Sequence, residues 1–343
     1  YPFVDLIFGT HNIGNLPKLI DECIEKKSKV IEVISTQGGI LEGAPKVRLS
    51  QHKAWVNIMY GCDEFCTYCI VPYTRGKERS RDKEDIINEV NDLVKQGYKE
   101  ITLLGQNVNA YGKDKNDGYT FGDLLVDLDK TGIARIRYTT SHPRDLDDKT
   151  IEAMAKCPSV MPQLHLPVQS GDDEVLRRMN RKYTHDHYMG LIQKLKSAIP
   201  GISITTDIIV GFPGETKEDV DETIDVIRRV KYDNAFTFIY SKRTGTPAAA
   251  MEQVPEELVK EQFDRVLKTV QETAREQVSR YQGQICDVLV EEINENDSSL
   301  VTGRMSNNTL VHFPGDISLV GKLVNVSLDE CHGFYYMGHM VQS

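Results

Sequence analysis

The chain has 343 residues, of which 40% are hydrophobic and 27% are charged, values typical of an ordinary soluble protein with two or three domains. The net charge of −10 disfavours a surface that is basic all over, as in proteins that wrap a nucleic acid. Seven cysteines in this length do not make a disulfide scaffold and fit a reducing compartment, so we expect a cytoplasmic protein. No apolar run approaches ~20 residues, and we expect no membrane partner.

The first 45 residues predict a strand, a helix and a strand, at residues 4–8, 16–26 and 29–34. Gly38, Gly39 and Pro45 then predict a linker. This α/β unit is too short to build its own core. Because the chain opens with Tyr1, close to the first strand, we expect a fragment that lacks an N-terminal portion.

From residue 46 to 275 the sequence alternates regularly between strands and helices. Six apolar, β-rich runs predict strands at residues 55–60, 100–104, 135–139, 163–168, 203–210 and 235–240. Helical periodicity fills the gaps, and Thr216 with Asp219 resembles a capping box before the last of these helices. Strands separated by helices pair in parallel through right-handed crossovers. We therefore expect an α/β fold, an open six-stranded parallel βα barrel with its site at the strand carboxyl ends.

The remaining residues predict a long charged helix, at 255–281, and then a small all-β domain at 276–343. Its short strands are expected at residues 285–293, 299–304, 310–313, 322–328 and 333–340. Five such strands favour a small closed β-barrel, a fold that often binds nucleic acid. From residue 276 onward, however, there are three basic residues against nine acidic ones. Electrostatics alone therefore does not nominate this domain as an RNA clamp.

Three cysteines, Cys62, Cys66 and Cys69, fall within eight positions directly after the first predicted strand of the barrel. Three thiolates can hold three irons of a cubane cluster and leave the fourth iron open to a small chelating molecule. A structural zinc ion needs a fourth ligand, and the nearest candidate, His52, lies on the far side of the strand. A disulfide would leave one thiol over. The spacing favours an iron–sulfur cluster, with zinc and free thiols as the alternatives.

The pattern Cys62-x-x-x-Cys66-x-x-Cys69, with Tyr68 inside it, resembles the signature of the radical S-adenosylmethionine (SAM) superfamily. Longer matches resemble its methylthiotransferase branch, at residues 66–81, 103–112 (LLGQNVNAYG), 139–143 (TTSHP), 164–171 (LHLPVQSG), 206–216 (TDIIVGFPGET) and 245–248 (GTPA). The run QNVN at residues 106–109 resembles the MiaB branch, which acts on tRNA. The C-terminal domain resembles a TRAM domain, a small RNA-associated β-barrel. Residues 1–45 would be the remnant of an N-terminal methylthiotransferase domain.

The resemblance implies an enzyme that transfers a methylthio group to the adenine C-2 of isopentenyladenosine next to the anticodon of tRNA, using SAM as methyl donor and radical source. It implies one [4Fe–4S] cluster in this chain, SAM, and a second, auxiliary cluster in the missing N-terminal part. The implied partners are tRNA, an electron donor such as flavodoxin or ferredoxin, and a sulfur carrier. Alternatives are a methylthiotransferase for a ribosomal-protein aspartate or for threonylcarbamoyladenosine in tRNA, and a zinc-stabilised RNA-binding module.

Site residues also follow from the resemblance, because its motifs fall at the ends of successive predicted strands. The cluster ligands would be Cys62, Cys66 and Cys69. The positions that would bind SAM are Tyr68, Gly105, Gln106, Asn107, Ser141, Gln169, Ser170, Arg181, Gly211 and Gly214. Arg75 and Arg79 are expected to contact substrate phosphate. His142 is a further candidate, whereas His165 is expected to be a packed histidine.

Overall fold

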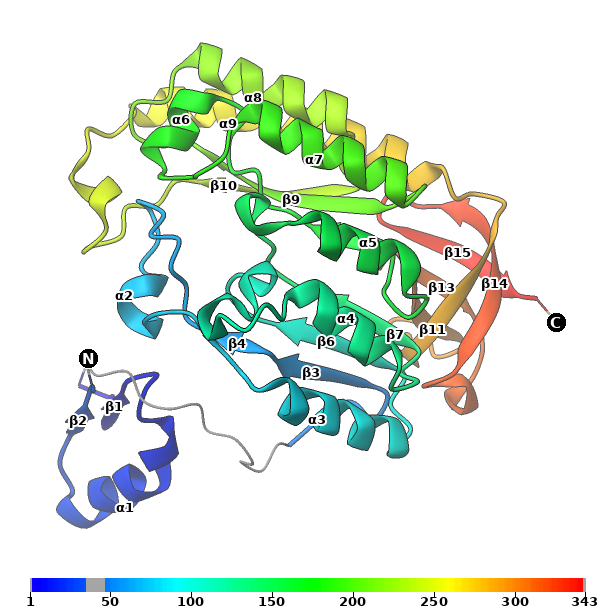
Figure 1. The fold of residues 1–343 in the computed structure, drawn as a ribbon. Coiled ribbons are helices and arrows are strands. Elements are labelled where there is room, and N and C mark those ends of the chain that lie inside the picture. Colours follow the sequence, from blue (N-terminus) through cyan, green and yellow to red (C-terminus); the bar gives the residue numbers. More distant parts are fainter. Residues whose placement is uncertain (1, 35–46, 342–343) are drawn as a thin grey trace.

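The centre of the molecule is an open barrel of six parallel strands (Figure 1). The computed structural model describes residues 2–34 and 47–341, so the predicted linker at Gly38, Gly39 and Pro45 lies outside the described residues. The strands form two sheets, β3-β6-β7 and β10-β9-β8, which meet where Ile136 bridges Val160 in parallel. Their bounds are β3 Lys53–Asn57, β6 Glu100–Leu104, β7 Arg135–Tyr138, β8 Gln163–His165, β9 Ser203–Val210 and β10 Asn234–Ile239. The predicted barrel is confirmed.

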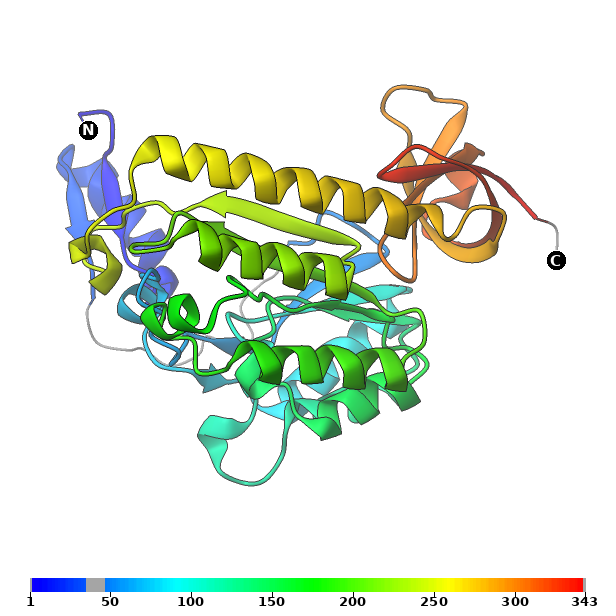
Figure 2. The ribbon, with the colours of Figure 1, turned by 90° about the horizontal axis from the view of Figure 1, so that it is seen from above.

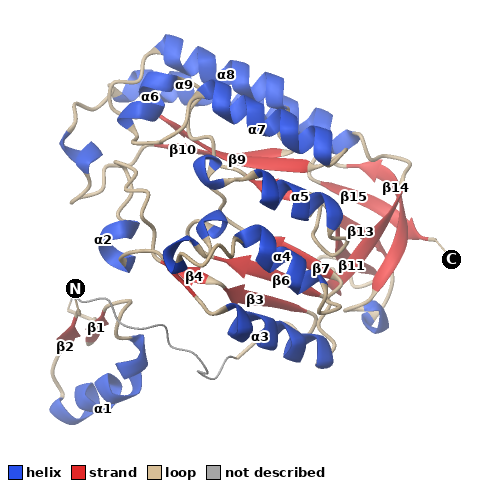
Figure 3. Cartoon of the chain, viewed as in Figure 1, coloured by secondary structure: helices blue, strands red, loops and turns tan. Residues whose placement is uncertain are grey.

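Helices cover the outer face of both sheets (Figure 3). They are α3 Lys83–Lys95, α4 Phe121–Asp129, α5 Asp148–Lys156, α6 Asp173–Arg178, α7 His185–Ala198 and α8 Lys217–Val230. Alternate strand residues such as Ile101, Leu103 and Ile208 are fully buried in the single large core that forms between strands and helices. The capping box of α8 is confirmed, since Asp219 N donates to Thr216 Oγ1 (3.2 Å) and Thr216 N donates to Asp219 Oδ2 (2.9 Å).

The first predicted strand, residues 55–60, is in fact two strands. After β3 the chain changes partners at Ile58, whose N–H donates to Leu104 O (2.9 Å) while its carbonyl accepts from Arg81 N (2.9 Å). The next two residues form β4 (Met59–Tyr60), which pairs antiparallel with β5 (Arg79–Ser80). Sequence periodicity shows an extended run but not a change of partner within it. The resulting hairpin encloses residues 61–78, including the cysteines and the short helix α2 (Val71–Arg75).

A long helix, α9 (Glu256–Ser279), leads from the open barrel to a second, closed β-barrel (Figure 2). The strand order of this barrel is β11-β12-β13-β15-β14. Its strands are β11 Ile285–Ile293, β12 Leu300–Met305, β13 Leu310–Pro314, β14 Leu323–Cys331 and β15 Tyr335–Met340. Val288, Phe313 and Tyr336 are fully buried inside it. The prediction of a small closed β-barrel is confirmed.

The closed barrel lies at the amino ends of the parallel strands. Two buried arginines near the start of β7 reach its backbone: Arg135 Nη1 donates to Arg304 O (2.9 Å) and Arg137 Nη2 donates to Met305 O (2.8 Å). Glu100 at the start of β6, only 2% exposed, accepts from Arg137 Nε (3.0 Å). The two barrels are therefore joined at the end of the sheet opposite the cysteine loop.

The N-terminal unit consists of β1 (Leu6–Phe8), α1 (Leu16–Lys26) and β2 (Val30–Glu32), with the two strands parallel. Its Thr10 Oγ1 donates to Thr74 O (2.8 Å), so it contacts the segment that follows the cysteines. Figure 1 shows this unit and the closed barrel at opposite ends of the molecule. In the two described ranges, no helix combines the length and the apolar character that crossing a membrane requires.

Candidate functional site

The cysteine loop (residues 61–69) begins at a glycine that no other residue can replace without strain. Gly61 has φ +77°, and a Cβ there would lie 2.0 Å from Lys77 O. This close approach allows Cys62 N to donate to Gly76 O (3.1 Å). The hairpin of β4 and β5 thus closes beneath the loop, at the carboxyl end of the open barrel, and holds the three thiols there.

The far side of the loop is fixed by the segment after α6. Thr67 N donates to Met179 O (3.0 Å), and Asn180 Nδ2 donates to Phe65 O (2.9 Å). Phe65 itself has φ +50°, a left-handed conformation that a non-glycine residue adopts only where its surroundings impose it. The loop is therefore held in one shape from two sides before any ligand binds.

Arg181 connects this segment to the cysteines. Its side chain is 8% exposed; Nη1 donates to Cys66 Sγ (3.4 Å), Nη2 to Pro167 O (3.1 Å) and Nε to the hydroxyl of Tyr183 (3.0 Å). The resemblance implied contact with the ribose or the carboxylate of SAM. In the structure the guanidinium lies against a cysteine sulfur, where its positive charge would stabilise a thiolate.

The spacing of the three sulfurs differs from that of a mononuclear zinc site. Among the described residues, the one group of three metal-ligating side chains whose ligand atoms all lie within 4.8 Å of one another is Glu64, His142 and Asp145, so at least one pair of the cysteine sulfurs is further apart than 4.8 Å. Tetrahedral zinc with bonds of about 2.3 Å brings thiolates to roughly 3.8 Å. Burial raises the pKa of Cys62 to about 12, so a metal must displace a proton to bind there. The wider spacing suits a larger, polynuclear group.

The positions implied for SAM binding converge on the same end of the barrel. Gly105, Gln106 and Asn107 follow β6, Ser141 follows β7, Gln169 and Ser170 follow β8, and Gly211 and Gly214 follow β9. Buried side-chain atoms there have no hydrogen-bond partner in the protein: Gln106 Oε1, Asn107 Oδ1, Ser141 Oγ and Gln169 Oε1. Buried polar groups are nearly always satisfied in native proteins. Such a concentration of unsatisfied atoms fits a polar ligand, and the residues present match the amino, carboxylate and hydroxyl groups of SAM.

A cavity of about 290 Å³ adjoins the cysteine loop. Tyr68, Cys69 and Gln169, all expected at the site, line it together with Ile209, Phe238 and Arg243. The Tyr68 ring packs edge-on against the Phe212 ring with centroids 6.4 Å apart, which fixes one wall. Sequence reasoning did not single out Arg243. It lies four residues past the end of β10, in an irregular stretch that comes just before the GTPA match.

Two of the residues expected to bind SAM have a local structural role. Gly214 has φ +78°, and a Cβ there would lie 2.0 Å from Arg178 Nη1, so the turn after β9 closes only around glycine. The hydroxyl of Ser170 is fully buried against Thr223 Oγ1 of α8 (3.4 Å) and is not part of the cavity wall. A direct contact between Ser170 and SAM stays a prediction.

Sequence analysis identified only His142 and Asn107 in a buried polar cluster that lies behind the cysteine loop. Glu64, from within the loop, is 2% exposed and lies with its Oε2 3.5 Å from His142 Nε2. Asn107 Nδ2 donates to Asp145 Oδ2 (2.6 Å), and Arg144 forms ion pairs with both carboxylates. Burial raises the pKa of Glu64 to about 7 and lowers the pKa of His142 to about 2. The only signal in the sequence for this cluster was the pair of adjacent acidic residues, Asp63 and Glu64, between the first two cysteines.

The two arginines expected to contact phosphate lie on the segment that encloses the cysteine loop. Arg75 ends helix α2 and is exposed, and Arg79 is in β5 and partly exposed. Both are therefore on the rim of the site, where a polyanion could approach. Contact with substrate stays a prediction.

Two family profiles match the chain. The profile of the Radical SAM superfamily matches residues 56–227, and that of the TRAM domain matches residues 279–341. Among solved structures, coproporphyrinogen III oxidase of Escherichia coli, described as a radical SAM enzyme, has 15% sequence identity and a TM-score of 0.48, covering 65% of this chain and 53% of that chain.

Curated relatives named tRNA-2-methylthio-N(6)-dimethylallyladenosine synthase match almost the whole chain. That of Geobacillus thermodenitrificans is 55% identical over 342 residues, covering 99% of this chain and 65% of the relative. That of Lachnoclostridium phytofermentans is 53% identical over 344 residues, covering 100% of this chain and 75% of the relative. The chain thus spans about two thirds of the length of several relatives. It belongs to the radical SAM superfamily and, within it, to the family of these tRNA-2-methylthio-N(6)-dimethylallyladenosine synthases.

Proposed function

We propose that this chain is the SAM-cleaving and tRNA-binding part of a methylthiotransferase that acts on N6-dimethylallyladenosine next to the anticodon and places a methylthio group on adenine C-2. The observation that carries the proposal is the meeting of three cysteines with a ring of unsatisfied buried polar atoms at one end of an open barrel. SAM would serve both as methyl donor and as radical source. The names of the relatives support tRNA as substrate.

Cys62, Cys66 and Cys69 would hold a [4Fe–4S] cluster, and the site residues fit SAM beside it. When bound and reduced, this pair supplies the radical that removes hydrogen from the substrate base. The chain's own residues would hold the cluster and SAM in position and enclose them. Arg181 would offset thiolate charge at Cys66, since it already donates to Cys66 Sγ.

Each part of SAM has complementary groups at the site. The oxygens of Gln106 and Asn107, unsatisfied in the protein, can accept from an ammonium group. The Ser141 hydroxyl and the Arg243 guanidinium can donate to a carboxylate, for which arginine has matching geometry. Tyr68 and Gln169 line the 290 Å³ cavity and would hold the adenosine part. Gly211 and Gly214, both with positive φ, shape the turn after β9.

The whole reaction also needs electrons and sulfur, for which we propose a small electron-transfer protein and a sulfur carrier as partners. Arg75 and Arg79, on the rim, would contact tRNA phosphate, and the TRAM barrel would bind further along the RNA.

Anaerobic reconstitution with iron and sulfide tests the proposal. We expect about four irons per chain in the 61–69 loop. After reduction, we expect release of 5′-deoxyadenosine that increases on addition of an RNA stem-loop containing N6-dimethylallyladenosine. The same 5′-deoxyadenosine assay is run with a ribosomal-protein peptide and with an RNA containing threonylcarbamoyladenosine, and the three rates of release are compared. Stoichiometric zinc without iron, and no 5′-deoxyadenosine, would instead identify an RNA-binding module.

A further inference from the structure

The face of the β8-β9-β10 sheet that is not covered by helices carries large aromatic side chains. In the register of β9 and β10, Phe236 pairs with Asp207 and Phe238 pairs with Ile209. On β9, the residues that alternate with Asp207 and Ile209, such as Ile208, are buried on the helix side. Because paired residues of neighbouring strands point to the same face, both phenylalanines project into the interior of the open barrel.

These aromatic rings are unusually exposed for residues on a central sheet. Phe236 and Phe238 are each 51% exposed. Phe238 and Ile209 also line the cavity that contains Cys69, so the apolar wall runs from the cysteine loop down the inside of the barrel. A contiguous apolar surface left open to solvent in this way typically marks a binding site.

Polar groups lie beside this wall, on the neighbouring strands. His165 Nε2 is 3.5 Å from Asp207 Oδ1, and His165 Nδ1 is 3.0 Å from Thr205 Oγ1. The imidazole of His165 contacts the Phe236 ring edge-on, with centroids 5.9 Å apart. The inner face therefore offers hydrogen-bonding groups next to an apolar wall. His165 is a packed and hydrogen-bonded histidine, as expected, and its strand register places it on this inner face.

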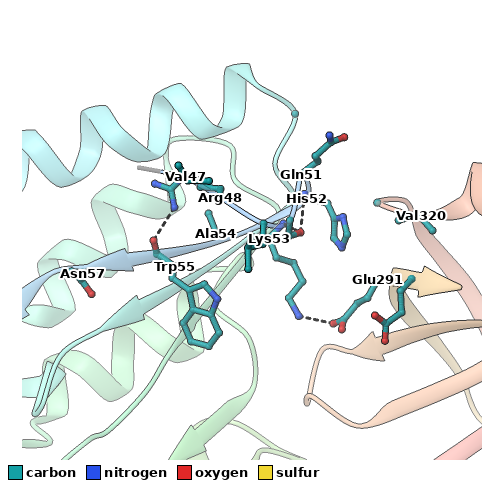
Figure 4. Close-up of a pocket in the computed structure, with 15 residues that line it drawn as sticks. Val47, Arg48, Gln51, His52, Lys53, Ala54, Trp55, Asn57, Glu291 and Val320 are labelled. Carbon is teal, nitrogen blue, oxygen red and sulfur yellow. Dashed lines mark hydrogen bonds and ion pairs between the residues drawn. The ribbon is translucent and has the colours of Figure 1, made fainter. Parts of the chain in front are cut away.

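The opposite edge of the barrel carries Trp55, the single tryptophan of the chain, which is 63% exposed. Figure 4 shows its indole projecting from β3, beside Lys53, which forms an ion pair with Glu291 of the closed barrel (2.7 Å). A cavity of about 1140 Å³ opens here between β3 and the closed barrel. Among the described residues, β3 pairs only with β6 and β10 only with β9, so Trp55 and Phe236 lie on the two strands that border the opening.

We propose that Phe236 binds the apolar N6 substituent of the target adenine, while His165, paired with Asp207, faces the polar edge of the purine. This inference rests on the proposed function and names what selects its substrate. The arrangement fits a planar, polar heterocycle with one hydrocarbon arm. A carboxylate-bearing substrate, such as an aspartate side chain or a threonylcarbamoyl group, would meet the Asp207 carboxylate and an apolar wall. The inner face thus selects a neutral, apolar arm.

Binding of three otherwise identical fluorescently labelled RNA stem-loops to the reconstituted chain tests this proposal. The loops carry adenosine, N6-dimethylallyladenosine or N6-threonylcarbamoyladenosine at one position. We expect the dimethylallyl RNA to bind roughly 10–100-fold tighter than the unmodified RNA, the range that a few buried carbons provide. In Phe236→Ala this ratio should fall to near one with little change in the affinity for unmodified RNA. Phe236→Leu should keep most of it. Quenching of the single tryptophan gives an independent readout.

Phe334→Ala is the control, because Phe334 is also an exposed phenylalanine (65%) but lies on the closed barrel, and its loss should leave the ratio unchanged. Asp207→Asn should improve binding of the threonylcarbamoyl RNA several-fold relative to the dimethylallyl RNA. Equal binding of the dimethylallyl and unmodified RNAs by the native chain, or an unchanged ratio in Phe236→Ala, overturns the inference. Release of 5′-deoxyadenosine without RNA, measured on the same preparations, reports separately on the proposed function, whose failure would show as no release at all.

Discussion

The two ends of the open barrel both bury polar groups, but they differ in how these groups are paired. At the end joined to the TRAM barrel, Glu100 lies between Arg135 and Arg137, and both arginines also donate to backbone carbonyls of the closed barrel. At the cysteine end, the buried Ser141 hydroxyl and an oxygen of Asn107 have no partner in the protein. The first arrangement stabilises the junction between domains. The second leaves binding capacity that the protein alone does not use.

This difference distinguishes buried polar groups that stabilise the fold from buried polar groups that are available to bind a ligand. A buried polar group without a partner costs about 1–3 kcal/mol, so a cluster of them is retained only where a ligand repays the cost. Substitutions of the paired groups at the TRAM end should therefore act on stability, whereas substitutions of the unpaired groups at the cysteine end should act on ligand binding. Four predictions test this contrast, from the largest expected effect to the smallest.

Replacing Cys66 with serine should abolish SAM cleavage. Cys66 is one of three ligands that would hold the cluster, and a hydroxyl is a poor ligand for iron–sulfur centres. We expect less iron per chain after reconstitution, loss of the visible absorption of the cluster, and no 5′-deoxyadenosine. Cys23→Ser, on α1 in the N-terminal unit, is the control and should keep all three signals. Full cluster content in Cys66→Ser would show that the loop is not the ligand set.

Much of this fold could be predicted from the sequence because its physical signals are local. Helical periodicity predicted helices in the gaps between the strands, where they are found, and Thr216 with Asp219 marked the start of α8. The partner exchange at Ile58 could not be predicted, because the extended run continues through it and only pairing with β5, 20 residues later, divides it. The hydrophobic pattern of one strand does not show which distant strand it pairs with.

For the site, the motifs predicted positions along the chain but not the contacts that their side chains make. Gln169 and Tyr68 line the cavity beside Cys69 as expected. Glu64 and Arg243 were missed, because acidic and basic residues are common in loops and only the fold shows that Glu64 is buried at the site and that Arg243 lines the cavity. Trp55 and Phe236 read as ordinary strand residues, and only the sheet register shows that they face the interior.

Replacing Glu100 with alanine should destabilise the chain by about 3–5 kcal/mol, because two buried arginines lose their shared carboxylate. Urea unfolding, followed by circular dichroism, measures the change. Glu291→Ala, which removes a partner of Lys53 at the more exposed rim of the same junction, should cost about 1 kcal/mol or less. SAM affinity should be the same in both variants. A loss of SAM binding in Glu100→Ala at temperatures where it is folded would contradict the division of roles.

Glu215, beside the turn at Gly211, should make stability depend on pH. Burial raises the pKa of its carboxyl from 4.5 to about 8, although Gly211 N donates to Oε2 (2.5 Å). The folded state therefore holds this proton more tightly than the unfolded state. Its contribution is fully present below pH 4.5 and is lost as the pH rises toward 8, so the free energy of unfolding should fall across that interval.

In Glu215→Gln, this fall should be reduced by a few kcal/mol between pH 5 and 8, as a difference of roughly three pKa units implies. Asp221→Asn is the control, since Asp221 is an exposed carboxylate on α8, the helix that follows Glu215, and pairs with Arg265. Urea unfolding at a series of pH values measures both slopes. Parallel slopes in the native chain and in Glu215→Gln would show that this carboxyl ionises in the folded state as easily as in water.

The smallest effect provides the sharpest comparison, because it sets two buried serines against each other. Ser141 Oγ at the cysteine end has no protein partner, whereas Ser159 Oγ donates to Asp129 Oδ1 (2.6 Å) away from the site. Ser159→Ala should cost about 1–2 kcal/mol in the free energy of unfolding and leave SAM affinity unchanged. Ser141→Ala should leave the stability of the ligand-free chain equal or slightly higher, because it removes an unsatisfied hydroxyl. It should weaken SAM binding by about 3–10-fold, the value of one hydrogen bond. Equilibrium dialysis with SAM and thermal unfolding of the same samples measure both, and equal losses of stability in the two variants would mean that Ser141 is a structural residue after all.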